Sequence, residues 1–71
     1  MKPDEIARLQ AYLRKTLKSP SLEVRRRPKK NDSAEVYIGE EFIAVLFRDD
    51  EDDDLSYNFQ MAILESDLDP A

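Results

Sequence analysis

The sequence is short and acidic, with 71 residues, 11 Lys plus Arg, 16 Asp plus Glu and a formal net charge of −5. One domain covering residues 1–71 is expected at this length. The sequence contains no Cys and no His, which removes disulfides, cysteine nucleophiles, the commonest metal ligand and the commonest general base. We therefore expect no catalytic residue, no cofactor and no metal site, and we predict that the protein is not an enzyme.

The charges are divided between the two halves of the sequence. Residues 1–34 contain ten basic and four acidic side chains, a net charge of +6, whereas residues 35–71 contain one basic and twelve acidic side chains, a net charge of −11. The overall charge of −5 therefore conceals a basic part that could meet an acidic partner.

The sequence also bears on the cellular compartment. No apolar run approaches the roughly 18–20 residues that a membrane-spanning helix needs. The first residues turn acidic at Asp4 and Glu5 and include no apolar stretch of signal-peptide length. We expect a cytoplasmic protein that does not interact with membranes.

The first predicted element is an amphipathic helix over about residues 3–18. Pro3 suits the first turn of a helix, and Asp4 and Glu5 place negative charge at the positive end of its dipole. Pro20 ends it, because the residue before a proline avoids the helical region. The apolar side chains recur every three to four residues and form one stripe that must pack on another element: Ile6, Leu9, Leu13 and Leu17.

The rest of the sequence predicts a meander of three or four antiparallel strands. Gly39-Glu40 is the expected two-residue turn, since glycine takes the positive φ that a hairpin requires. Residues 66–71 are expected to form a frayed tail. The predicted fold class is therefore α+β, with the N-terminal helix packed on the sheet. Alternating apolar and polar residues place the strands at about residues 22–25, 34–38, 41–47 and 55–64.

The turn and the alternation together predict the register. With Gly39-Glu40 as the turn, Ile38 opposes Glu41 and Val36 opposes Ile43. Phe47 is then expected to oppose Leu55. This register places one apolar set under the helix: Ala34, Val36, Ile38, Ile43, Val45, Phe47, Leu55, Tyr57, Phe59, Met61 and Ile63.

The opposite face of the predicted sheet is also apolar. Residues 42–47 are apolar on both faces, which is typical of strands covered on both sides, and one helix covers only one face. Scattered exposed apolar residues that bind nothing are the alternative interpretation. We predict an association surface for a second copy of the chain, or for another protein, formed by Tyr37, Phe42, Leu46 and Leu64.

The acidic run of residues 49–54 invites comparison with calcium-binding loops. In an EF-hand counted from Asp49, the sixth residue would be Asp54 instead of Gly, and the twelfth would be Gln60 instead of Glu. The flanking residues also predict strands instead of helices. A solvated loop whose charges repel one another is the favoured interpretation, and weak surface binding of a divalent cation is the alternative.

A basic segment follows the first predicted strand. The aromatic side chains of Tyr37 and Phe42 could stack on the bases of a single-stranded nucleic acid beside it, although the net negative charge of the protein opposes this function. The alternative interpretation of the segment is a solvated loop, or a contact for an acidic part of a protein partner. Its five basic side chains are Arg25, Arg26, Arg27, Lys29 and Lys30.

Over residues 27–39, 47–52 and 55–61, and over residues 9–14 in the predicted helix, the sequence resembles a small alphaproteobacterial family catalogued as domain of unknown function 3126. The resemblance implies a small bacterial cytoplasmic protein with an α+β fold and carries over no catalytic or binding residue. We predict a non-enzymatic interaction module that forms a homodimer through its second sheet face. Single-stranded nucleic-acid binding through residues 25–30 and the sheet aromatics is the alternative.

Overall fold

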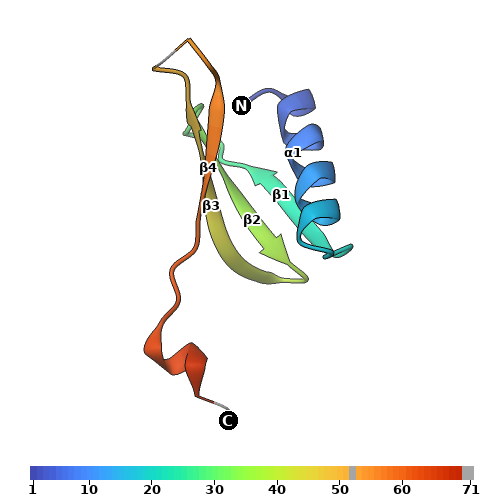
Figure 1. Ribbon diagram of the computed structural model, residues 1–71, viewed down its shortest axis with the longest axis vertical. Coiled ribbons are helices and arrows are strands. Elements are labelled where there is room, and N and C mark those ends of the chain that lie inside the picture. The colour runs from blue at the N-terminus through green and yellow to red at the C-terminus, as the bar shows by residue number, and fades with distance from the viewer. Residues whose placement is uncertain (52, 70–71) are drawn as a thin grey trace.

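A single helix packs on one face of a four-stranded antiparallel sheet (Figure 1). The computed structural model describes residues 1–51 and 53–69. The strands follow one another in the sheet in the order of the sequence, so every connection joins neighbours. This architecture confirms the predicted α+β fold. Its elements are α1 (Pro3–Thr16), β1 (Leu22–Arg26), β2 (Ser33–Ile38), β3 (Glu41–Asp49), β4 (Ser56–Gln60) and a 3₁₀ turn, η1 (Glu65–Leu68).

Helix α1 begins and ends with recognisable caps. The Glu5 carboxylate accepts a hydrogen bond of 3.0 Å from the backbone N–H of Lys2, which satisfies a donor that the first turn leaves unpaired. At the other end, Lys18 has a φ of 53°, in the left-handed region that often terminates helices. The N–H of Ser19 then donates to the carbonyl of Arg14 over 2.9 Å. The helix therefore ends two residues earlier than predicted, and the chain turns back into β1.

The core is small and lies between α1 and the sheet. Leu22, Ala34 and Val36 are fully buried, and Leu46 is 2% exposed. Ile6 and Leu9 of the helix stripe are partly buried against this cluster, as the amphipathic pattern predicted. Leu17, which we assigned to the same stripe, is 49% exposed because it lies beyond the last helical residue. The buried apolar residues are Met1, Leu13, Leu22, Val24, Ala34, Val36, Ala44 and Leu46.

The predicted register is correct at the turn and wrong beyond it. Ile38 opposes Glu41 as expected, but a β-bulge follows, so that Val36 opposes Ala44 instead of Ile43. A bulge adds one residue to one strand, and every later side chain of that strand then moves to the other face. As a consequence, Leu46 of β3 faces the helix, where we had expected its odd-numbered neighbours.

The pairing of β3 with β4 also differs from the prediction. Phe59 opposes Leu46, whereas its predicted partner was Ile43, and Phe47 opposes Asn58 instead of Leu55. Pairing stops at Gln60, four residues before the predicted strand end.

Residues 61–69 leave the sheet as an extension that we call the C-terminal arm (Figure 1). It consists of an irregular stretch and the 3₁₀ turn η1, which overlaps the tail predicted from residue 66. Residues 70 and 71 of that prediction lie outside the described residues. The arm explains why the radius of gyration is 13.1 Å, compared with about 11 Å for a compact domain of this length.

Candidate interaction surface

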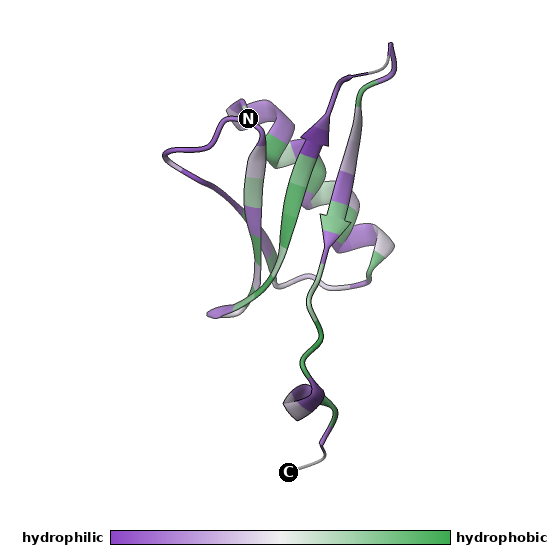
Figure 2. Ribbon diagram, turned by 90° about the vertical axis from the view of Figure 1, so that its left-hand side faces the viewer, coloured by the Kyte–Doolittle hydropathy of each residue, from purple (hydrophilic) through white to green (hydrophobic). Residues whose placement is uncertain are grey.

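The sheet face opposite α1, here called the open face, has an apolar row along β3. Figure 2 looks onto this face, with the helix behind the sheet and the hydrophobic colour concentrated on the third strand. Phe42 is 51% exposed and Phe47 is 39% exposed, while Val45 between them is half-buried. The sheet therefore presents apolar side chains to the solvent where a two-layer fold would bury them.

Two of the four predicted association residues lie on this face. The rings of Tyr37 and Phe42 meet edge to face, with centroids 5.6 Å apart. The prediction for Leu46 was wrong, because the β-bulge turns this side chain into the core, where it is 2% exposed. Val45 and Phe47, which we had assigned to the helix side, take its place, whereas Ile43 packs against the core as we expected. The apolar run of residues 42–47 gave no alternation from which the bulge could be found.

Leu64, the fourth predicted residue, lies in the C-terminal arm and lines a groove together with the open face. The groove has a volume of about 400 Å³. Phe42 and Phe47 line it from β3, and Leu64 and Asp67 line it from the arm. The structure thus brings the arm and the apolar row of β3 to one concave surface.

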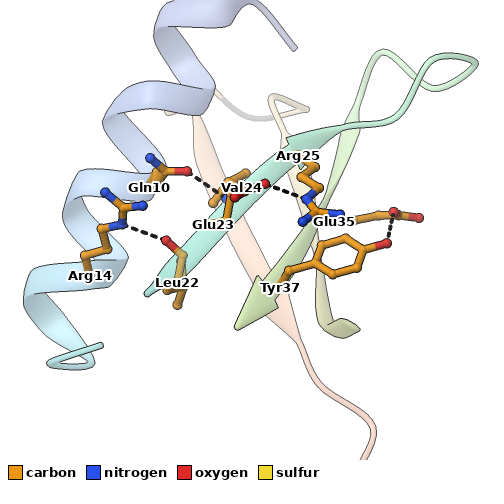
Figure 3. Close-up of polar contacts among 8 residues, drawn as sticks. All are labelled: Gln10, Arg14, Leu22, Glu23, Val24, Arg25, Glu35 and Tyr37. Atoms are coloured by element: carbon orange, nitrogen blue, oxygen red, sulfur yellow. Dashed lines mark hydrogen bonds and ion pairs between the residues drawn. The ribbon is translucent and has the colours of Figure 1, made fainter. Parts of the chain in front are cut away.

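A polar network flanks the apolar row on the β1 side (Figure 3). The Arg25 guanidinium lies 4.0 Å above the Tyr37 ring and pairs with Glu23. The Tyr37 hydroxyl donates a hydrogen bond of 3.0 Å to Glu35, and this bond to a carboxylate raises the pKa of the Tyr37 phenol. Arg27 also pairs with Glu35, over 3.6 Å.

This network changes the interpretation of the basic segment. Arg25 covers the ring that was expected to stack on bases, and both Arg25 and Arg27 are paired with carboxylates. Among the residues that the structure describes, no ion pair involves Arg26, Lys29 or Lys30. The two lysines line a hollow of about 350 Å³ together with Arg27, Pro28 and Glu35, which we call the basic hollow.

The two edges of the sheet differ. On the outer edge of β1, the Val24 N–H donates to the Gln10 side chain over 3.0 Å, and Arg14 donates to the Leu22 carbonyl over 2.6 Å (Figure 3). These helix side chains occupy backbone groups that could otherwise pair with another strand. Within the described residues, no such contact covers the outer edge of β4.

The acidic loop between β3 and β4 contains no metal-binding arrangement in the part of the chain that the structure describes, since no three acidic side chains converge there. Asp52 of the predicted run lies outside that part. No described helix has the length and apolarity required for crossing a membrane.

A buried acid that the sequence did not single out connects the helix to the sheet. The Glu5 side chain is 9% exposed and accepts a 2.6 Å hydrogen bond from the Tyr57 hydroxyl, and Arg48 lies 3.5 Å from the same oxygen. The bond from Tyr57, the backbone N–H of Lys2 and the charge of Arg48 lower the pKa of Glu5, against the opposing effect of burial. The same bond raises the pKa of Tyr57. All these partners stabilise the carboxylate, so the geometry is that of a structural anchor.

The fold and the surface together define a small α+β domain with one covered and one open sheet face. The family described as "Protein of unknown function (DUF3126)" matches residues 5–67, and the chain belongs to this family. No curated protein and no solved structure matches the chain significantly. The match confirms the resemblance noted in the sequence and assigns no role to any residue.

Proposed function

We propose that the protein is a non-enzymatic interaction module that associates with a second copy of itself through the open face. The observation that carries this proposal is the apolar row of Phe42, Val45 and Phe47 on the sheet face opposite the helix. The lack of Cys and His, which removes cysteine nucleophiles and the commonest general base, supports the non-enzymatic part.

The exposed area of the chain supports an association. The surface measures 5777 Å², whereas a folded monomer of 8.3 kDa has about 4,600 Å² by the usual scaling with mass. The excess is about 1,200 Å², and each partner of a standard interface buries about 800 Å². The chain therefore exposes enough additional surface to supply its half of a stable dimer.

The layout of the open face suits pairing with itself. Its apolar row lies on β3. The polar network around Tyr37 flanks the row on one side, and Asn58 and Gln60 of β4 flank it on the other. An apolar centre with a polar rim is the usual anatomy of an interface. In a two-fold dimer the same patch serves both partners, so the row on β3 of each copy covers the row of the other.

Sedimentation equilibrium of the full chain between about 1 and 500 μM tests this proposal. We expect a dimer that Phe47→Asp dissociates, because the substitution buries a charge at the centre of the interface. Tyr12→Asp is the matched control, since Tyr12 is a 63% exposed aromatic residue on the helix, and it should leave the dimer intact. A monomer throughout the range, or equal dissociation by both variants, would refute the proposal.

Nucleic-acid binding gives a different result in a second measurement. We expect no saturable binding of a labelled 15-nucleotide oligothymidine at about 50 mM salt, because Arg25 and Arg27 are already paired with carboxylates. Salt-dependent binding that disappears in the Lys29→Ala, Lys30→Ala double variant would establish the alternative function instead.

A further inference from the structure

We propose that two copies exchange their C-terminal arms at the margin of this interface, so that the arm of each copy packs beside the β3 row of the other and its acidic end enters the other's basic hollow. This inference rests on the proposed self-association. It adds that the C-terminal arm and the charges of the basic hollow determine how the two copies are arranged.

The first observation is the exposure of the arm. Four of its apolar side chains remain largely in solvent: Met61 is 49% exposed, Leu64 61%, Ile63 63% and Leu68 70%. The arm also forms one wall of the apolar groove on the open face. Apolar groups that their own chain leaves in water favour burial on a partner that offers a matching groove, and a second copy offers such a groove.

The second observation is charge complementarity. The arm ends in three acidic residues, Glu65, Asp67 and Asp69, and contains no basic residue. Lys29 and Lys30 line the basic hollow and form no ion pair with any residue that the structure describes. Opposite charges of this kind orient two partners and suppress other arrangements.

The third observation is the placement of the two features at opposite ends of the sheet. The arm leaves β4 at Gln60, which pairs with Val45 in the middle of β3, and it runs from there toward the end of the sheet that carries the β2–β3 turn (Figure 1). The basic hollow lies at the far end, where the Arg48 N–H donates to the Asp32 carbonyl over 2.7 Å and joins its loop to β3. When two open faces stack with their strands antiparallel, the arm of each copy therefore begins near the middle of the other sheet and runs toward the end where the other copy has its basic hollow.

The arm is long enough for this exchange. Its nine residues span at most about 30 Å when extended, whereas the five residues of β4 span about 17 Å. An arm that is partly wound into η1 still reaches from its own sheet to the end of the other.

A charge-reversal experiment tests the exchange. In sedimentation equilibrium, Lys29→Glu with Lys30→Glu should raise the dimer dissociation constant about tenfold or more, because the reversed hollow repels the acidic arm. Adding Glu65→Lys and Asp69→Lys to that variant should restore the constant to within about threefold of the original. Asp67 is left unchanged because its carboxylate accepts the Leu64 N–H hydrogen bond of 3.0 Å.

The control and the remaining outcomes separate this inference from the proposed function. Lys15→Glu with Lys18→Glu gives the same change in net charge on α1 and its C-terminal turn, and it should leave the constant nearly unchanged. A dimer that dissociates with Phe47→Asp but tolerates reversal of the basic hollow would refute arm exchange and leave association through the open face in place. Failure of the arm reversals to rescue the hollow would also refute arm exchange, and a full chain that stays monomeric would refute both.

Discussion

Replacing Glu5 by glutamine tests the buried acid that joins α1 to the sheet. The Glu5 carboxylate accepts hydrogen bonds from the Tyr57 hydroxyl at 2.6 Å and from the Lys2 N–H at 3.0 Å, and it lies 3.5 Å from the Arg48 guanidinium. Hydrogen bonds to charged groups contribute about 1.5–3 kcal/mol each. Glutamine keeps the shape and one acceptor oxygen but loses the charge, so we expect a loss of about 2 kcal/mol at pH 7.

The assay is thermal unfolding followed by circular dichroism at one fixed protein concentration, because association also changes apparent stability. A loss of about 2 kcal/mol corresponds to a decrease in Tm of roughly 8–16 °C for a domain of this size. Glu51→Gln is the matched control. The Glu51 side chain is exposed in the acidic loop, and its substitution should change Tm little.

The pH dependence of the stability difference provides a second test of the Glu5 carboxylate. The pKa of Glu5 is lower in the folded protein than its ordinary value, with the hydrogen bond from Tyr57 as the largest cause. The carboxylate therefore contributes its full stabilisation above the unfolded pKa and loses it as the pH falls through the folded pKa. The difference between the original chain and Glu5→Gln should shrink between about pH 5 and pH 3. A difference that stays constant over this range, or no difference at pH 7, would contradict the anchoring role.

Four further substitutions test the fold. Gln10→Ala leaves the Val24 N–H without its partner and should cost about 1 kcal/mol in urea unfolding, with faster aggregation at high concentration as the β1 edge is uncovered; an unchanged midpoint would argue against this contact. Gly39→Ala meets no atom within 4 Å but must adopt a φ of 64°, so the expected cost is about 1–2 kcal/mol from backbone conformation alone. Leu46→Ala should cost about 2–4 kcal/mol by leaving a cavity, and Val45→Ala should cost less at dilutions that favour the monomer; the reverse order would refute the bulged register.

Local signals in the sequence were sufficient for the order and type of the elements. Pro3, the acidic first turn and the three-to-four spacing of apolar residues specify α1, and Gly39 specifies the turn between β2 and β3. These signals act over a few residues, so they can be interpreted without knowing what packs against them. The pairing of Ile38 with Glu41 follows from the turn alone.

The candidate surface was only half predictable. Tyr37 and Phe42 precede or adjoin the bulge and were placed on the correct face, but Leu46 lies beyond it and was placed on the wrong one. Residues 42–47 are apolar at every position, so neither register leaves a polar side chain in the core and the sequence pattern does not distinguish them. The Glu5–Tyr57 contact joins residues 52 positions apart, and no local sequence pattern predicts it.

The sequence by itself determined a small α+β chain, with its charges divided between two halves and more apolar strand surface than one helix can cover. Only the tertiary structure decided which of those apolar side chains are covered. The β-bulge between β2 and β3 adds one residue to β3. Because side chains alternate with a period of two, this extra residue turns Leu46 into the core and leaves Val45 and Phe47 on the open face. The pairing of β2 with β3 made this choice, which is why composition and alternation alone did not reveal it.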